Sequence, residues 1–294
     1  MFRLGIVGSD NSHAEAFSKL ANLDEGINGL RIDDVRVTHI YGTDPKRTEE
    51  VAAAGNIPHV VGDKEAMIGQ VDGILCVWRH GARHLSDVRP FLEAGIPAFV
   101  DKPLACSVED ARILIEAAQK AHVGFTSFST LRYAANVVEY MAELKKTAGV
   151  LTAGVSTGPA QIDSEYGGIF FYGIHAVELM NAVWGYGCER VRATLHSGNI
   201  VATCLFKDGP IVVLNLLGNA TYVFHLAAFG KDGWKEHTVD SGTCYYDGMQ
   251  VIMRTLRTGQ WPLTAEQLLE PVRILTAVNR SLKENREVSI EEMN

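Results

Sequence analysis

A short apolar run that ends in a charged pair and a proline constrains the fold of this chain most. Residues 98–100 are apolar and lead into Asp101-Lys102-Pro103-Leu104-Ala105. Such a run is typical of an interior parallel strand, and Pro103 ends it because proline has no N–H for a sheet ladder. Open α/β sheets bind ligands at the carboxyl ends of their strands. We therefore predict that Lys102 points its ammonium at a ligand, although most lysines simply lie on the surface.

The rest of the first half alternates short apolar runs with helical stretches, which predicts a parallel sheet wrapped in helices. The second half reads differently, because its strands are joined by the hairpin turns Lys207-Asp208-Gly209-Pro210 and Lys231-Asp232-Gly233. The predicted class is α/β: a doubly wound parallel sheet over 1–125, then an α+β domain with a largely antiparallel open sheet over 126–294. The expected strands are 3–7, 35–41, 59–61, 73–78, 97–100 and 124–128, then 150–157, 191–197, 200–206, 211–217, 221–229 and 235–239.

Composition excludes several classes of partner. A net charge of −8 and a pI of about 5.7 argue against nucleic acid and anionic membranes. The five cysteines are odd in number and lack C-x-x-C spacing, so we expect reduced thiols and no zinc site. A strand is expected at the first residues, which leaves no room for a signal peptide, and no apolar run approaches the ~18 residues of a membrane span. We expect a cytoplasmic protein.

The segment Asp101-Lys102-Pro103-Leu104-Ala105 resembles the Glu-Lys-Pro-Leu-Ala motif of a known enzyme family. This is the glucose-fructose oxidoreductase / inositol dehydrogenase (Gfo/Idh/MocA) family of NAD(P)-dependent oxidoreductases. Aspartate stands here where the family usually has glutamate. The resemblance implies an N-terminal dinucleotide-binding Rossmann domain and a C-terminal domain for substrate binding and oligomerisation. It further implies that Lys102 is a catalytic residue.

A second stretch, residues 166–179, is similar to the family's glycine pair followed by Asp-x-Gly-x-His-x-x-Asp. Gly173 and His175 match in register, whereas Phe171 replaces the first aspartate and Glu178 the second. The resemblance implies that His175 is the catalytic acid/base. At positions i and i+3 of a helix, His175 and Glu178 share a face, and a helix N-terminus disfavours the imidazolium cation. The alternative is a histidine on a helix surface, paired with a surface glutamate.

The first strand-to-helix turn, residues 5–13, lies where a Rossmann domain has G-x-G-x-x-G. Gly8 matches the first glycine, and Asp10 and His13 stand in place of the other two. The Asp10 carboxylate would repel a pyrophosphate unless it turned towards the helix backbone, which is the orientation we predict. Asp10, Asn11 and Ser12 are all good N-caps, so the turn could instead satisfy only its own helix.

The second strand should end in an acid for the adenosine ribose, but that position holds Gly42. Asp44 could serve instead, or Arg47 could meet a 2′-phosphate, so NAD and NADP both stay open. Equally, Asp44 could be a helix cap and Arg47 a solvated charge.

After the fourth strand, Arg79 and His84 resemble the family's cofactor-binding positions, and Trp78 is placed to cover the nicotinamide. His80 and His84 have the spacing of metal ligands on a helix, but Gly81 lies between them and no carboxylate pair is near. We expect no metal.

The predicted function is hydride transfer between NAD or NADP and a secondary alcohol or ketone of a sugar, inositol or related polyol. Two alternatives stay open: a non-catalytic sugar- or nucleotide-binding regulator, and a redox-neutral NAD-using lyase or hydrolase. The apolar strands of the second half predict a homodimer or homotetramer formed through the C-terminal sheet.

The catalytic residues are predicted to be Lys102 and His175. The cofactor-binding residues are predicted to be Gly8, Ser9, Asp10, Asn11, Ser12, Asp44, Arg47, Trp78, Arg79, His84, Asp101 and Lys102. The substrate-binding residues are predicted to be Arg132, Tyr133, Tyr172 and Glu178.

Overall fold

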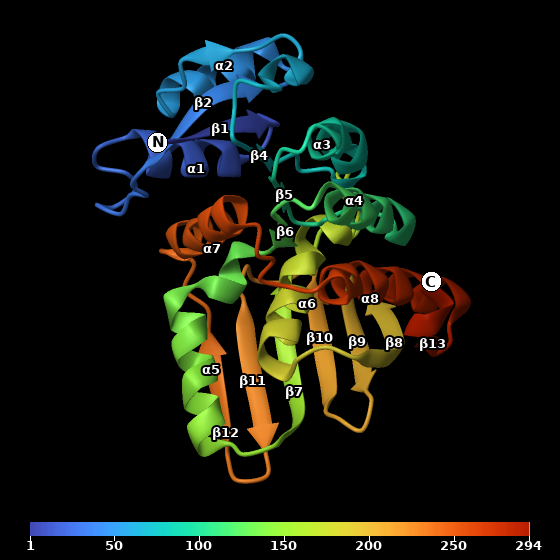
Figure 1. The fold of residues 1–294 in the computed structure, drawn as a ribbon. Helices are drawn as coiled ribbons and strands as arrows, with labels where there is room; N and C mark the ends of the chain where they lie inside the picture. Colours follow the sequence, from blue (N-terminus) through green and yellow to red (C-terminus); the bar gives the residue numbers. More distant parts are fainter. Residues whose placement is uncertain (294) are drawn as a thin grey trace. The chain divides into compact units, whose positions relative to one another are not determined.

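The computed structural model describes residues 1–293 of the 294. The chain forms two compact units, neither of which is continuous in sequence (Figure 1). The first unit consists of Met1–Ala105, Glu109–Phe128 and Tyr245–Thr264, and the second of Cys106–Val108, Ser129–Cys244 and Ala265–Asn294. The binding roles assigned above to 1–125 and 126–294 stay predictions.

The first unit contains a parallel sheet of six strands in the order β3-β2-β1-β4-β5-β6. Every residue of β4, β5 and β6 is buried, which confirms the interior parallel strands expected from their apolar runs. The strands are β1 (Phe2–Val7), β2 (Val35–Tyr41), β3 (His59–Val60), β4 (Gly73–Cys76), β5 (Ala98–Asp101) and β6 (Phe125–Phe128). The helices between them are α1 (Ser12–Asn22), α2 (Pro45–Ala54), α3 (His84–Glu93) and α4 (Val108–Ala121), with short 3₁₀ turns at Lys64–Met67 and Gly81–Arg83.

The strand order reverses between β1 and β4, since β1 pairs with β2 on one side and with β4 on the other. A doubly wound sheet opens a ligand crevice at such a switch point, beyond the carboxyl ends of the strands. The segments that leave this edge are those following Val7, Tyr41, Cys76 and Asp101. The predicted cofactor-binding residues therefore lie on loops that leave the same edge of the parallel sheet.

A segment from the far end of the chain completes the first unit. Helix α7 (Cys244–Thr258) and the residues after it belong with the parallel sheet from Tyr245 onward. The Trp261 indole N–H donates to the Val123 carbonyl at 2.8 Å, and its ring centroid lies 5.4 Å from that of Phe125 on β6. No local signal in residues 245–264 indicates this packing.

The second unit contains a seven-stranded sheet in the order β12-β11-β7-β10-β9-β8-β13. All its pairings are antiparallel except that of β7 with β10, so the predicted largely antiparallel sheet is confirmed. The strands are β7 (Leu151–Pro159), β8 (Cys188–His196), β9 (Asn199–Phe206), β10 (Ile211–Leu217), β11 (His225–Gly230), β12 (Trp234–Thr238) and β13 (Val288–Ser289). The helices are α5 (Ala135–Thr147), α6 (Phe170–Trp184) and α8 (Ala265–Glu284), with 3₁₀ turns at Thr130–Tyr133 and Ile290–Met293.

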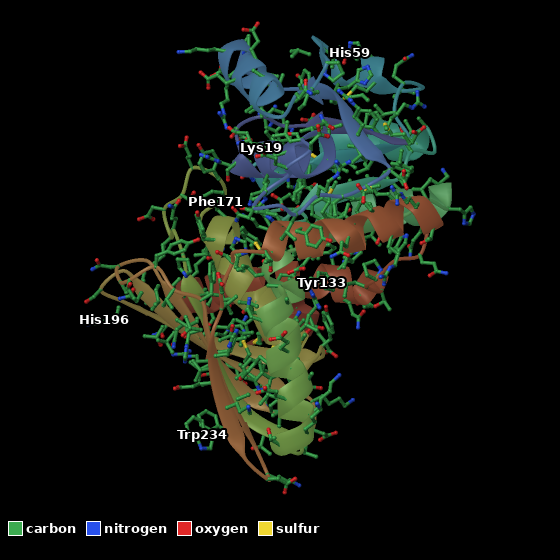
Figure 2. All side chains as sticks on the ribbon, turned by 90° about the vertical axis from the view of Figure 1, so that its left-hand side faces the viewer. Lys19, His59, Tyr133, Phe171, His196 and Trp234 are labelled. Atoms are coloured by element: carbon green, nitrogen blue, oxygen red, sulfur yellow. The ribbon has the colours of Figure 1, made fainter. Side chains whose placement is uncertain are left out.

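The three helices of this unit lie on one face of its sheet, while the Trp234 and His196 side chains point away from them (Figure 2). Along β9 and β10 alternate residues are buried, as expected for strands with one covered face. The residues between them on the open face are still apolar in part: Val201 and Ile211 are 48% and 46% exposed. This face is the one that the sequence predicts for self-association.

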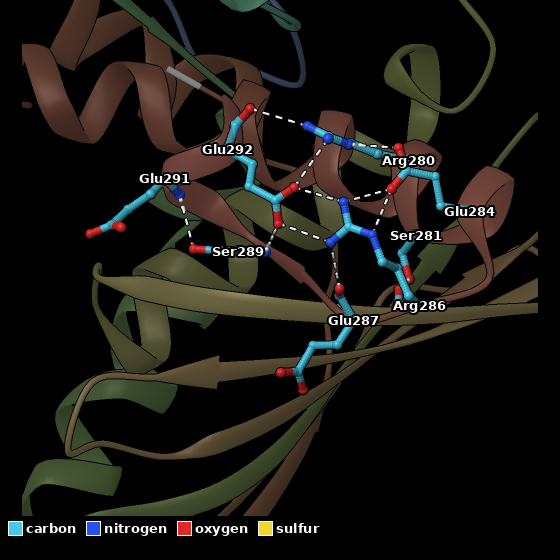
Figure 3. A network of polar contacts seen from close by, with 8 residues as sticks. All are labelled: Arg280, Ser281, Glu284, Arg286, Glu287, Ser289, Glu291 and Glu292. Atoms are coloured by element: carbon cyan, nitrogen blue, oxygen red, sulfur yellow. Dashed lines mark hydrogen bonds and ion pairs between the residues drawn. The ribbon is translucent and has the colours of Figure 1, made fainter.

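An ion-pair network fastens the end of the chain to the end of α8 (Figure 3). The Arg286 guanidinium contacts Glu292 at 2.7 Å and Glu284 at 2.6 Å, and Arg280 contacts the same two carboxylates. These side chains are all at least 32% exposed. Exposed ion pairs stabilise a fold by only about 0–1 kcal/mol each, so we expect each of these contacts to contribute little.

Within residues 1–293, no helix is both long enough and apolar enough to cross a membrane.

Candidate functional site

Lys102 lies directly after β5, at the carboxyl edge of the parallel sheet, and is only 4% exposed. Burial lowers the pKa of its ammonium and the nearby Arg79 charge lowers it further, while Asp101 opposes both. A buried lysine of lowered pKa at a ligand edge is the arrangement found where a lysine exchanges protons or polarises an oxygen.

The Asp101 carboxylate is fully buried beside the β1–α1 turn. Asn11 donates to Asp101 Oδ2 at 3.2 Å, and His13 Nδ1 lies 2.5 Å from the same oxygen. Burial alone would raise the pKa of Asp101, but His13 and Lys102 hold it below its ordinary value. Asp101, which is shorter than the glutamate usual in the family, therefore contacts the turn through His13. His13 is the residue that stands in place of the third glycine.

Asp10 does not turn towards the helix, so that prediction is wrong. Asn11 caps α1 by accepting the His13 N–H at 3.2 Å, while Asp10 Oδ1 faces the Arg79 N–H at 3.4 Å, beyond β4. Burial raises the pKa of the Asp10 carboxyl, and the Arg79 N–H and the charges of Arg79 and Arg83 oppose that shift. Ser9 is buried in the same turn, and Ser12 is the exposed first residue of α1.

The turn nevertheless fits a dinucleotide. Gly8 has φ +110°, and a Cβ there would lie 2.8 Å from the Trp78 backbone nitrogen, so only glycine suits this position. Asp101 Oδ1 is buried without a hydrogen-bond partner among the described residues, at the edge where Lys102 and Arg79 supply positive charge. The N-terminus of the eleven-residue α1 adds the positive end of a helix dipole. These residues suit an anionic ligand with polar groups, such as the pyrophosphate and ribose of a dinucleotide.

Asp44 and Arg47, at the other end of the predicted cofactor site, already have protein partners. The Asp44 carboxylate caps α2 by accepting the Arg47 N–H at 3.2 Å. The Arg47 side chain donates to the Ser9 carbonyl at 3.2 Å and to Glu15 at 2.6 Å. Asp44 is thus a helix cap, which is the alternative named above. Arg47 links α2 to the β1–α1 turn by hydrogen bonds.

Trp78 and His84 lie inside the first unit. Trp78 is 1% exposed, its indole N–H donates to Asp87 at 2.8 Å, and the Arg83 guanidinium lies 3.6 Å from its ring centroid. His84 is fully buried, with its ring nitrogens near the carbonyl oxygens of Leu104 and Trp78, and burial lowers its pKa. Both side chains therefore pack within the unit, and their contact with a cofactor stays a prediction.

His80 does not pair with His84, because its Nδ1 accepts the Ala82 N–H at 3.2 Å and caps the 3₁₀ turn. The described part of the chain holds no group of three or more histidine, cysteine or carboxylate side chains suited to a metal ion. All five cysteines are free thiols in the structure.

In the second unit, His175 lies on α6 and is 7% exposed. Its Nδ1 atom lies 2.7 Å from the Ser129 hydroxyl, which also accepts the Leu131 N–H at 3.3 Å. Ser129 follows β6 directly and is fully buried. The sequence reasoning missed Ser129, although it comes directly after a predicted strand, as Lys102 nearly does.

Arg132 and Glu178 bind each other in the structure. Arg132 Nη1 lies 2.5 Å from Glu178 Oε2, and both side chains are more than 90% buried. The second guanidinium nitrogen donates to the Tyr186 hydroxyl at 2.9 Å. Burial alone would lower the pKa of Arg132, but Glu178 raises it overall. Burial also raises the pKa of Glu178, and the Arg132 charge opposes that shift. Burial raises the pKa of Tyr186 to about 12.

The other two residues predicted to bind substrate are aromatic neighbours of these groups. The Tyr133 ring lies 5.5 Å from the Arg132 guanidinium, and the Tyr172 ring lies 5.8 Å from that of His175. Phe224 flanks the other side of the His175 ring at 5.4 Å. His175 therefore lies among aromatic rings. Phe171 stands where the family motif has its first aspartate, so this position supplies no carboxylate.

Comparison with known proteins bears on the family and the fold of the chain. Residues 2–128 match the family model described as "Oxidoreductase family, NAD-binding Rossmann fold" (Gfo/Idh/MocA). An inositol 2-dehydrogenase from Cereibacter sphaeroides is 29% identical over 118 residues, which are 39% of this chain and 32% of that protein. The match thus spans about a third of the length of this curated relative.

Two solved structures share the fold over almost all of both chains. A probable dehydrogenase from Thermotoga maritima superposes with a TM-score of 0.84 at 19% identity and covers 100% of each chain. A scyllo-inositol dehydrogenase from Lactobacillus casei, solved with NAD(H) and scyllo-inositol, has a TM-score of 0.86 at 16% identity and covers 99% of each. At these identities the likeness establishes the fold, and the family model covers the sheet that carries Gly8 and Lys102. Residues 2–128, which carry the parallel sheet, thus match the Gfo/Idh/MocA oxidoreductase family with its NAD-binding Rossmann fold.

Proposed function

We propose that this protein is an NAD(P)-dependent dehydrogenase that interconverts a secondary alcohol and a ketone on an inositol, sugar or related polyol. The observation that carries the proposal is the buried Lys102 ammonium at the carboxyl edge of a family-matched parallel sheet. The similarity to inositol dehydrogenases supports a polyol as the substrate class. A bound nicotinamide dinucleotide would supply the hydride acceptor or donor.

Lys102 is assigned to the reacting oxygen of the substrate. Its ammonium donates a hydrogen bond there and stabilises the negative charge that develops when the hydroxyl proton leaves. Burial and the nearby Arg79 lower its pKa, which brings its proton closer to exchange at neutral pH. The Asp101 charge opposes this lowering of the pKa.

His175 is assigned to exchange the hydroxyl proton. Since Nδ1 faces the Ser129 hydroxyl, the Nε2 atom is the one that takes up or returns the proton. The aromatic rings of Tyr172 and Phe224 restrict the imidazole to a narrow range of orientations.

We expect the purified chain to bind a nicotinamide dinucleotide despite the Asp10 carboxylate. Calorimetric titration with NADH and with NADPH measures this directly, and it requires no substrate. Gly8→Val is the matched variant: a side chain there would collide with the Trp78 backbone, so binding should be lost.

Absence of binding of either dinucleotide at millimolar concentration would overturn the dehydrogenase proposal. The regulatory alternative, which Asp10 and Phe171 favour, would then take its place. A redox-neutral lyase or hydrolase would bind the cofactor but release no net NAD(P)H from a polyol panel.

We also expect self-association through the open face of the second sheet. Phe229 and Trp234 on this face are 41% and 62% exposed and stack with ring centroids 6.2 Å apart. Together with Val201 and Ile211 they form an apolar surface of the kind that marks interfaces. Light scattering at micromolar concentration should give a dimer or tetramer mass, and Ile211→Glu should lower it. A monomer mass for the parent chain would contradict the expectation.

A further inference from the structure

We propose that the adenosine end of the cofactor site selects NADP(H) over NAD(H), with Arg83 and Thr43 as ligands of the 2′-phosphate. The inference deepens the proposed function and rests on it. It arises from the side chains that meet beyond the carboxyl end of β2, where Rossmann domains read the ribose 2′-position.

No carboxylate can stand at the position that normally binds the 2′-hydroxyl. That position is Gly42, and a Cβ there would overlap Ser9 Oγ and Thr48 Oγ1. Those two hydroxyls are 2.9 Å apart, and Ser9 and Thr48 are each 1% exposed. Thr48 also donates to the Asp44 carbonyl at 2.6 Å, so it cannot move aside without disturbing the start of α2. The packing that excludes an acid here is part of the fold.

The next carboxylate, Asp44, is engaged as the cap of α2 and has Arg47 three residues away. A helix cap is geometrically demanding, because its oxygen must stay on the N–H groups of the first turn. Because its carboxylate caps the helix, Asp44 is poorly placed to hydrogen-bond the ribose 2′-hydroxyl.

Arg83 brings a guanidinium to the same loop. Its Nη1 lies 3.5 Å from Thr43 Oγ1, and its guanidinium carbon lies 3.6 Å from the Trp78 ring centroid. The side chain remains 39% exposed, unlike the indole beneath it. A guanidinium stacked on an aromatic ring is held in orientation while its N–H groups stay available at the edge, which suits a phosphate.

Two carboxylates also lie near Arg83. Asp87 is 3.8 Å from Nη2, but it already accepts the Trp78 indole N–H at 2.8 Å and lies 3.5 Å from the Lys64 ammonium. Asp10 is close enough to interact with the Arg83 charge, and it accepts the Arg79 N–H. Both acids also accept hydrogen bonds from other groups, so neither is committed to Arg83 alone.

The test is calorimetric titration of the full chain with NADPH and with NADH. We expect NADPH to bind about 10- to 100-fold more tightly, as charge-assisted phosphate contacts of this kind provide. Adenosine 2′,5′-bisphosphate should likewise bind more tightly than AMP, which isolates the adenosine end. The NADPH advantage should shrink between 50 mM and 500 mM salt, because the added contact is ionic.

Arg83→Leu should remove most of this advantage and leave NADH affinity within about 3-fold of the parent. Arg89→Leu is the matched control, since Arg89 lies on α3, pairs with Glu93 and is 55% exposed. It removes the same charge away from the loop and should leave both affinities unchanged. If Arg83→Leu does not fold, Thr43→Val tests the same subsite.

NADH binding as tightly as NADPH would overturn this inference and leave the proposed dehydrogenase intact. An NADPH preference that survives in both Arg83→Leu and Thr43→Val would overturn the assignment of these residues. Failure of both dinucleotides to bind would overturn the proposed function together with the inference.

Discussion

His175→Ala is expected to lose about 10²- to 10⁴-fold of kcat, the usual loss when a general acid/base is removed. The hydroxyl proton would then have no acceptor at the His175 Nε2 atom, whereas the residues of the first unit that are proposed to bind cofactor are unchanged. Steady-state NAD(P)H production measures the loss, with a substrate found in a panel of inositols and sugar derivatives. Cofactor affinity by calorimetry should stay close to that of the parent.

Ser129→Ala provides a graded comparison for His175→Ala. It removes the hydroxyl that faces Nδ1 and should lower kcat by less than the loss of the imidazole itself, because the ring is still present. Lys102→Ala should also lose kcat, and Lys102→Arg should not restore it, because a guanidinium cannot exchange a proton at neutral pH. Parent-like turnover in His175→Ala would show that the base lies elsewhere, with Tyr172 the next residue to test.

Glu178→Gln is expected to reduce the free energy of unfolding by about 3–5 kcal/mol. The substitution keeps the shape of the side chain but leaves the Arg132 guanidinium, 7% exposed, without its counter-charge. Urea denaturation followed by fluorescence measures the change, and the slope of the transition should be unaltered.

Glu287→Gln is the matched control for Glu178→Gln in the same unit. Glu287 pairs with Arg190 at 3.0 Å, with side chains 43% and 53% exposed, so its loss should cost at most about 1 kcal/mol. The double variant Arg132→Met with Glu178→Leu should recover most of the loss, since it removes both buried charges together. A loss for Glu178→Gln as small as that for Glu287→Gln would show that water reaches the buried pair.

Several features of the fold were predictable because their signals are local. Residues 35–41 and 211–217 were predicted as strands and form β2 and β10 with the same bounds. The apolar run before Lys102 and the proline after it placed that lysine at the carboxyl end of β5. Short-range alternation and backbone chemistry decide such features, so they can be read without knowing what packs where.

Local signals failed where several residues compete for one role. Asp10, Asn11 and Ser12 are all good N-caps, and only the path of the turn decides that Asn11 caps α1 while Asp10 faces Arg79. Burial also separates residues that look alike in sequence: Trp78 enters the core, whereas Arg83, five residues later, covers its ring from outside.

The sequence by itself determined the two kinds of sheet, the family that residues 2–128 match and the position of Lys102 at the carboxyl edge of the parallel sheet. Only the tertiary structure decided the partners: Ser129 for His175, Glu178 for Arg132, and α7 for the parallel sheet. The first two pairs are each separated by 46 residues. Hydrogen bonds and ion pairs across such separations depend on how whole elements pack, and no local propensity records that.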